Sequence, residues 1–245
     1  MVRFIPLYVL LFLFTTACVS YKRQYAKTAR KWESNKPAPN LTLKHTMYLI
    51  GDAGNASAEA TTPVLAFLKT RLSSESEKSS ILFLGDNIYE SGMPPKEEVA
   101  KREVAEFRIT AQLQILDDFK GRPIFVPGNH DWRGWGQKGL KSQEKFIEEY
   151  LNEKKGVTDK DDWQNYFLPD DGCSGPEVIE LNDNVVVLVV DSQWWLGDSD
   201  EEPKFNEGCE ARNKASFRFV FENVVRKYKN QQVVVAMHHP PYTYG

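Results

Sequence analysis

The sequence is poor in cysteine and histidine and has no long run of one charge. These scarcities argue against several classes of function. Only 3 cysteines and 4 histidines occur among 245 residues, and no two cysteines have the spacing of a zinc-binding pair. The net charge is −3 and no long basic run occurs, which argues against nucleic acid as the main partner. The sequence also has no internal repeat and no low-complexity tract, and its length suits one sizeable domain or at most two small ones.

One apolar run stands at the N-terminus, and it is too short to span a bilayer comfortably. Residues 4–14 follow Arg3 and have the shape of a secretory signal. Residues 15–17 are small and precede Cys18, as in a bacterial lipoprotein signal, although Thr15 stands where such signals usually carry leucine. We therefore expect an exported protein of the bacterial cell envelope, lipid-anchored to a membrane at Cys18. The alternative is a signal peptide cleaved nearby without lipid.

The remaining cysteines, Cys173 and Cys209, lie in the polar, loop-like stretches DDGCSGPE and NEGCEAR. Loops can adapt to the geometry of a disulfide, and exported proteins commonly contain one. The sequence predicts a disulfide between these two residues, with two free thiols as the alternative.

Beyond the predicted signal at residues 1–18, the chain divides into a polar segment at 19–44 and a domain at 45–245. The segment contains Pro37 and Pro39 and little periodicity, which is typical of a tether. In the domain, strands are expected in TMYLIGDAG, SSILFLGDN, RPIFVPGNHDW, EVIELNDNVVVLVVDS (two strands turning at 182–183) and QQVVVAMHHPPY. Helices are expected at 57–73, 97–119, 141–154 and 210–228. This alternation predicts an α/β fold with parallel strand pairs.

Four of the predicted strands end in residues that commonly bind metals. Each has an ordinary interpretation as a turn, cap or core residue, but ligands gather where the strands of such sheets end. Carboxylates, an amide oxygen and imidazoles converging from separate strands indicate a pair of cations. The residues are Asp52, Asp86, Asn129 with His130, and His238 with His239.

The segments GDAG, GDNIY, PGNHDW and MHHPPY resemble, in order and approximate spacing, the sequence blocks of calcineurin-like metallophosphoesterases across residues 46–242. The resemblance implies two packed mixed β-sheets flanked by helices. GDAG lacks the histidine that many relatives carry two residues after the first aspartate, and GDNIY supplies Tyr89 instead. That exchange is similar to the purple acid phosphatase branch, in which a tyrosinate binds ferric iron.

The resemblance further implies two metal ions that share the carboxylate of Asp86. The ligands would be Asp52, Asp86 and Tyr89 for one ion, and Asp86, Asn129 and His238 for the other. Iron is expected at the Tyr89 site, and iron, zinc or manganese at the second. We favour His238 over His239 because the family's ligand lies two residues before a proline, here Pro240. His239 would then lie near the site, on the substrate side, or be structural.

The implied reaction is hydrolysis of a phosphate ester by a metal-bound hydroxide. His130 would hydrogen-bond the phosphate or protonate the leaving oxygen, and Asp131 would orient His130 or simply cap a turn. The remaining candidates, which would line a substrate cleft or pack in the core, are Trp132, Trp194 and Trp195.

The last family block, Gly-His-x-His, is absent from the sequence, which stops at Gly245. We expect a fragment whose remainder carries that block and completes the fold, with a further fused module beyond residue 245 as one option; a natural truncated form is the alternative. Two other functions stay open. One is an inactive binding or scaffold domain, and the other is a phosphodiesterase or nuclease acting at the same site.

Overall fold

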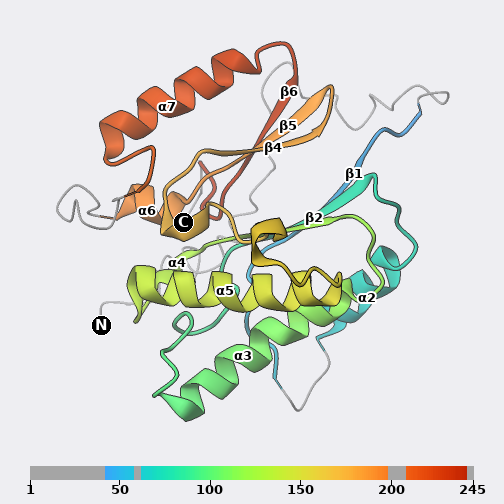
Figure 1. The fold of residues 1–245 in the computed structure, drawn as a ribbon, viewed down its shortest axis with the longest axis vertical. Coiled ribbons are helices and arrows are strands. Elements are labelled where there is room, and N and C mark those ends of the chain that lie inside the picture. Colours follow the sequence, from blue (N-terminus) through green and yellow to red (C-terminus); the bar gives the residue numbers. More distant parts are fainter. Residues whose placement is uncertain (1–41, 58–61, 198–207, 242–245) are drawn as a thin grey trace, which may run out of the picture. The chain divides into compact units, whose positions relative to one another are not determined.

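The computed structural model describes residues 42–57, 62–197 and 208–241 of the chain. Contacts divide the chain into residues 1–43 and 44–245, and nearly all described residues belong to the second unit (Figure 1). The predicted signal peptide, Cys18 and most of the predicted tether lie outside the described residues. Within the described ranges, every helix is too short or too polar to cross a bilayer.

The first sheet contains three parallel strands in the order β1-β2-β3. They are β1 (Thr46–Ile50), β2 (Ser79–Leu84) and β3 (Arg122–Val126). Helix α2 (Pro63–Leu72) connects β1 to β2, and α3 (Val99–Leu113) connects β2 to β3. Because all three strands run in the same direction, their carboxyl ends lie at one edge of the sheet.

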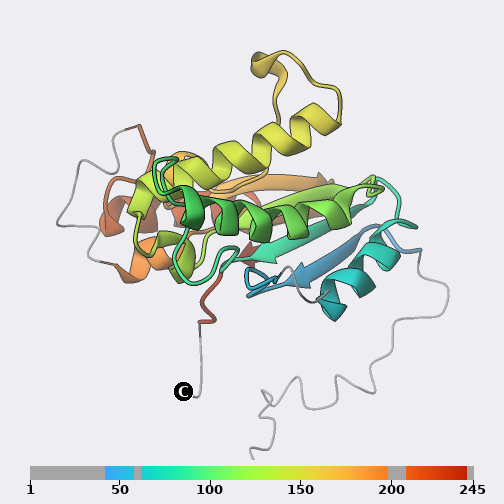
Figure 2. The same ribbon diagram turned by 90° about the horizontal axis from the view of Figure 1, so that it is seen from below.

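Alternate residues of β2 point to opposite faces of this sheet. Both faces are buried, which is why its central residues are apolar. Ile81 and Phe83 pack with Ile109 of α3 and Ile147 of α5 (Gly136–Lys154), so the helices cover one face (Figure 2). Leu82 belongs to a different cluster on the other face.

The second sheet has the order β4-β5-β6, with an antiparallel β4-β5 pair and a parallel β5-β6 pair. Its strands are β4 (Glu177–Asn182), β5 (Val185–Val189) and β6 (Gln232–Ala236). Val187 and Val189 of β5 share a core cluster with Leu82 of β2, so the two sheets pack against each other. Helix α7 (Lys214–Lys227) packs on the other face of the second sheet (Figure 1). The predicted fold, two packed sheets flanked by helices, is confirmed.

Several predicted boundaries shift by a few residues. The helix expected at 97–119 begins at Val99 and ends in a 3₁₀ turn at Gln114–Leu116, and the one expected at 141–154 begins earlier, at Gly136. Helix α7 begins at Lys214 because Asn213 caps it, accepting a hydrogen bond from the Ser216 N–H.

Two other local details differ from the expectation. The turn between β4 and β5 consists of residues 183–184, one position later than expected, with the Asn182 side chain accepting from the Asn184 N–H. Helix α2 begins with Pro63 in its first turn, where the missing N–H costs nothing. The predicted start of that helix at 57 falls beside residues 58–61, which lie outside the described ranges.

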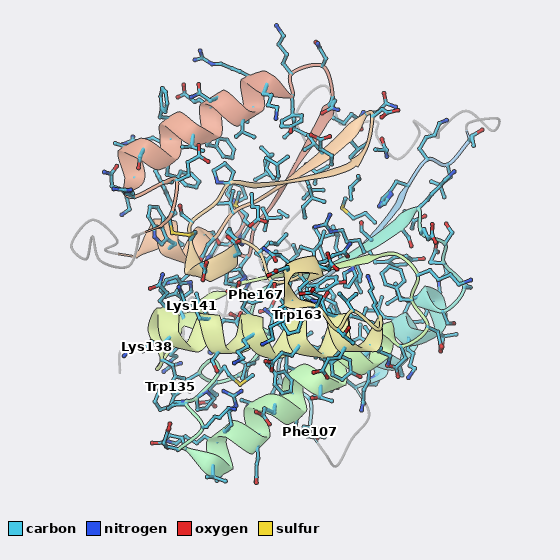
Figure 3. The ribbon with its side chains drawn as sticks, in the orientation of Figure 1. Phe107, Trp135, Lys138, Lys141, Trp163 and Phe167 are labelled. Carbon is cyan, nitrogen blue, oxygen red and sulfur yellow. A yellow bond between two sulfur atoms is a disulfide. The ribbon has the colours of Figure 1, made fainter. Side chains whose placement is uncertain are left out.

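The predicted disulfide is present. Cys173 and Cys209 are bonded, with their Cα atoms 5.7 Å apart (Figure 3). Cys173 directly follows the short 3₁₀ helix η5 (Asp170–Gly172), and Cys209 is buried. The bond therefore joins the segment before β4 to the segment before α7.

Candidate metal centre

The candidate metal centre lies where β1, β2, β3 and β6 end, and tight backbone turns bring its side chains together. Asp52 and Asp86 follow β1 and β2 in left-handed backbone conformations, with φ of 57° and 54°, which aspartate tolerates better than most residues. Gly85 has a φ of 89°, and a Cβ there would lie 2.7 Å from His238 Nδ1 and 2.8 Å from the Cα of Gly128. Only glycine lets the chain turn this closely against both neighbours.

Carboxylates from two strands meet an imidazole from a third at this point. Asp52, Asp86 and His238 each offer one donor atom, and these atoms all lie within 4.8 Å of one another. Asp86 is buried, whereas Asp52 is exposed. Of the described histidine, cysteine, aspartate and glutamate residues, this is the group whose geometry could hold a metal ion.

Tyr89 reaches both carboxylates from the turn after β2. Its hydroxyl lies 2.8 Å from Asp52 Oδ1 and 2.9 Å from Asp86 Oδ2, and it donates to them. Burial raises the pKa of Tyr89, and the hydrogen bonds to the two carboxylates raise it further. A bound cation would have the opposite effect, because its charge stabilises the phenolate.

The second group of donors surrounds His238. Its Nδ1 lies 2.8 Å from the carbonyl oxygen of Leu84, and its Nε2 lies 3.0 Å from Asn129 Oδ1 and 3.5 Å from Asp86 Oδ1. The Leu84 oxygen can only accept, so in the neutral ring the proton sits on Nδ1 and the Nε2 lone pair faces two oxygens. A carbonyl that fixes the outer nitrogen in this way is typical of metal-binding histidines. The donor set therefore fits a cation between His238, Asn129 and Asp86.

His130 stands over the same site. Its Nδ1 lies 2.7 Å from the carbonyl oxygen of Glu90, its Nε2 lies 4.0 Å from Asp86 Oδ2, and its ring centroid lies 4.3 Å from that of Tyr89. Its backbone N–H donates to Asp86 Oδ1 at 2.9 Å. With Nδ1 held by a carbonyl, Nε2 is the nitrogen that faces the carboxylates.

Asp131 has a different environment from the one expected for a partner of His130. It is fully buried in α4 (Asn129–Trp132) and accepts from the backbone N–H groups of Gly128, Asn87 and Ile88 at 2.8, 3.0 and 3.1 Å. Burial raises the pKa of Asp131 to about 6, against the lowering effect of these hydrogen bonds. The hydrogen bond that orients His130 comes from the backbone of Glu90, and Asp131 instead holds the turn after β2 against α4.

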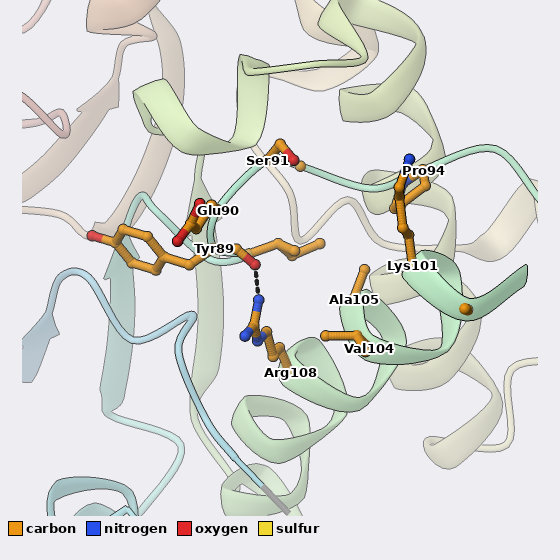
Figure 4. Close-up of a pocket in the computed structure, with 11 residues that line it drawn as sticks. Tyr89, Glu90, Ser91, Pro94, Lys101, Val104, Ala105 and Arg108 are labelled. Carbon is orange, nitrogen blue, oxygen red and sulfur yellow. Dashed lines mark hydrogen bonds between the residues drawn. The ribbon is translucent and has the colours of Figure 1, made fainter. Parts of the chain in front are cut away.

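Helix α3 holds the same turn from the other side, through contacts that sequence reasoning missed. Arg108 donates to the carbonyl oxygen of Tyr89 (Figure 4), and Gln112 donates to the carbonyl oxygen of Asn87 at 2.8 Å. The two residues are four positions apart, so they lie on the same face of the helix. Gln112 is fully buried, but that burial is visible only in the structure, so the sequence contains no signal for this contact.

The remaining candidates lie next to the centre. His239 Nδ1 is 2.9 Å from Ser192 Oγ, and its ring stands edge-on to that of His238 with the centroids 4.7 Å apart. Trp132 donates through Nε1 to Asp191 at 2.7 Å. Trp194 is buried in an aromatic core cluster, and Trp195 is partly buried against it. The structure thus places His239 beside the donor group and Trp194 in the core.

A comparison with protein families identifies a family that matches most of the chain. The model of the calcineurin-like phosphoesterase family matches residues 45–245. The chain has no significant match among curated proteins or among solved structures. Members of the family hydrolyse phosphate esters with divalent metals, and the donor group described above lies within the matched residues. The chain therefore belongs to the calcineurin-like phosphoesterase family.

Proposed function

We propose that this chain is the phosphatase domain of a purple acid phosphatase-like enzyme, which hydrolyses phosphate esters at two metal ions. The observation that carries the proposal is the position of the Tyr89 hydroxyl, within 2.9 Å of carboxylate oxygens from two strands. A phenol placed between two carboxylates would become a third anionic ligand once its proton is lost.

The ligands divide into two groups that share one residue. Asp52, Asp86 and Tyr89 would hold one ion, for which the phenolate favours iron; Asp86, Asn129 and His238 would hold the second, which is iron, zinc or manganese. A metal pair of this kind activates water, orients the phosphate and offsets the charge that develops during attack.

The chain's own residues supply the proton chemistry around the bound ester. His130 presents Nε2 towards the carboxylates while Glu90 holds Nδ1, so Nε2 is the atom that would contact the phosphate and give a proton to the leaving oxygen. Asp131 and Arg108 position the turn after β2 and do not touch the reacting atoms. Asn129 has two roles, because it opens helix α4 and points its amide oxygen at His238.

We further propose that the protein is exported and lipid-anchored at Cys18. The shape of residues 1–18 supports this, and so does the Cys173–Cys209 disulfide, since such bonds persist mainly in oxidising compartments.

The deciding experiment is metal analysis and visible spectroscopy of the purified protein, with Tyr89→Phe as the matched control. The proposal expects two metals per chain and a tyrosinate–iron absorption band that Tyr89→Phe removes without unfolding the domain. A metal-loaded wild-type protein without that band would be consistent with a phosphoesterase but would overturn the assignment of iron bound by tyrosinate. A folded protein that cannot be loaded with metal would overturn the proposed activity.

A further inference from the structure

The segment that joins β5 to α6 (Ser192–Leu196) supplies none of the proposed metal ligands, yet its polar side chains are buried. Asp191 is completely buried, and Ser192 is only 7% exposed. Burying a carboxylate or a hydroxyl is costly unless hydrogen bonds replace those lost to water. Both side chains find such partners, and the partners belong to the elements that carry the metal centre.

Asp191 joins this segment to helix α4. Its Oδ2 accepts a hydrogen bond from Trp132 Nε1 at 2.7 Å, and its Oδ1 accepts from the Trp194 N–H at 2.9 Å. The second contact caps α6. The first has a different reach, because Trp132 is the last residue of α4 and the proposed ligand Asn129 is the first. Asp191 therefore holds the helix that carries Asn129.

Ser192 joins the same segment to the residues that follow β6. Its Oγ accepts the backbone N–H of His239 at 3.0 Å and lies 2.9 Å from His239 Nδ1. Beside this contact, the Val190 N–H donates to the carbonyl oxygen of Ala236 at 3.0 Å, so the ends of β5 and β6 stay paired. Since His239 directly follows the proposed ligand His238, Ser192 fixes the backbone on which His238 stands.

Together these contacts close a circuit around the second proposed metal site, because His238 Nε2 returns to Asn129 Oδ1 at 3.0 Å. With the proton of the neutral His238 ring on Nδ1, these two atoms are both acceptors and do not attract each other. Other contacts have to keep them close until a cation binds. We call this loop the Asp191 circuit, and its members are Asn129, Trp132, Asp191, Ser192, His239 and His238.

From these observations we propose that Asp191 is a positioning residue for the second metal ion. It does not touch the ion. It acts through Trp132 on one side and through its neighbour Ser192 on the other, and so sets the distance between Asn129 and His238 before the ion binds. The inference rests on the proposed function, because it takes these two residues as ligands of that ion. A site assembled in advance binds more tightly, since less conformational freedom is lost on binding.

The test opens the Asp191 circuit at one contact at a time and measures Zn²⁺ binding to the iron-loaded protein in competition with a chelator. Trp132→Phe removes the indole N–H and keeps an aromatic ring, and Ser192→Ala removes the hydroxyl. The matched control is Tyr228→Phe, which removes a hydrogen bond of 2.6 Å to Glu180 near the start of β5. We expect each circuit variant to weaken Zn²⁺ binding about tenfold, as is common for residues behind metal ligands. The control should not change it, and the tyrosinate band of the first ion should persist in all three variants.

The double variant shows whether the two contacts act as one circuit. A second cut in an open circuit has little left to loosen. The loss in Trp132→Phe with Ser192→Ala should therefore stay within about threefold of either single loss, whereas independent contacts would give about a hundredfold.

Two variants of Asp191 itself complete the series. Asp191→Ala removes the acceptor of Trp132 and should weaken Zn²⁺ binding as much as Trp132→Phe does. Asp191→Asn keeps an oxygen that can accept the indole N–H and should regain part of the affinity. If Asp191→Ala fails to fold, the two single variants and their combination still decide the question.

The outcomes separate this proposal from the proposed function. Wild-type Zn²⁺ affinity in both single variants, or fully additive losses in the double variant, would overturn the positioning role and leave the phosphoesterase standing. Equal weakening of both metal sites, or the same loss in Tyr228→Phe, would show a general loss of stability and would also overturn it. A folded wild-type protein that binds no second ion would overturn the proposed function, and the positioning role with it.

Discussion

Carboxylates gather at two places in this domain, and the two places are built differently. At the metal centre, Asp52 and Asp86 meet the phenol of Tyr89, from the same turn as Asp86, and the imidazole of His238, which follows β6. The second place, the acidic cluster, joins α5, η5 and the start of β4. Its members are Glu144, Glu148, Asp170, Asp171 and Glu177.

The acidic cluster directs its carboxylates at backbone amides. Glu144 accepts from the Asp171 N–H at 3.0 Å, Glu148 from the Tyr166 N–H at 3.2 Å, and Glu177 from the Asp170 N–H at 3.1 Å. Burial raises the pKa of Glu144 to about 8, and that of Glu148 and of Glu177 to about 7. The comparison teaches that a concentration of acidic groups does not define a metal site. What defines it is the convergence of different donor types on one point.

The largest expected effect comes from Asp86→Asn, because Asp86 is the residue that the two proposed ligand groups share. This variant should lose bound metal and at least about 100-fold in phosphatase activity, given that disturbing even an outer partner of a metal ligand commonly costs 10–100-fold. Elemental analysis and initial rates measure the two losses. Glu144→Gln in the acidic cluster is the control and should keep the metal. Full metal content in Asp86→Asn would contradict the assignment.

His238→Ala should remove one of the two proposed metal ions and leave the other bound. It removes the donor supplied by β6 and leaves Asp52, Asp86 and Tyr89 in place. We expect about half the metal content, with retention of the tyrosinate band, measured on the same sample. His239→Ala is the matched control and should retain both metals. If His239→Ala loses metal and His238→Ala does not, the choice between the two histidines was wrong.

A smaller effect, measured here as a loss of stability, is expected from Asp131→Ala. The substitution leaves the N–H groups of Gly128, Asn87 and Ile88 buried without their acceptor. We expect the free energy of unfolding to fall by about 3 kcal/mol, measured by urea denaturation of the metal-free protein. The exposed Asp118→Ala should change it by less than about 0.5 kcal/mol. Equal stabilities of the two variants would show that Asp131 does not hold the turn.

The last effect is the pH dependence of stability that the acidic cluster confers. The folded-state pKa values of Glu144, Glu148 and Glu177 lie above the ordinary value of 4.5, so the folded state binds protons more tightly than the unfolded state. Their contribution to stability is present below about pH 4.5 and is lost as the pH rises towards about 8. The Tm of the wild type should therefore fall as the pH rises from 5 to 8. It should fall less steeply in Glu144→Gln than in Glu149→Gln, which is a control at a partly exposed position on the same helix. If Tm falls equally with pH in the two variants, the acidic cluster does not cause the pH dependence of stability.

The order of strands and helices was predictable because each strand is a short apolar run and each long helix repeats its apolar residues. The donors were predictable for a related reason: parallel strands end at one edge, so Asp52, Asp86 and Asn129 had to approach one another. The short helices α4 and α6 were not predicted, since segments of four and five residues are too brief to show periodicity.

The contacts that position the turn after β2 were equally hidden. Arg108 and Gln112 of α3 lie 19 and 25 residues after the residues of the turn that they contact. No local sequence pattern predicts a contact over such a separation. For Asp131 two roles were open, orienting His130 or capping a turn, and the structure agrees with the second, since Asp131 accepts the backbone N–H of Gly128 before α4. Consecutive residues of a helix point in directions about 100° apart, so adjacency within α4 sends the two side chains to different partners.

The disulfide has a consequence for how the domain would respond to a protease. It links residues separated by 36 positions, and the closed loop contains β4, β5 and α6. A single cut of the backbone anywhere inside that loop would leave both products covalently joined. The nicked protein would migrate as one band on a non-reducing gel and as two after reduction, so an intact mass under oxidising conditions is no proof of an intact chain.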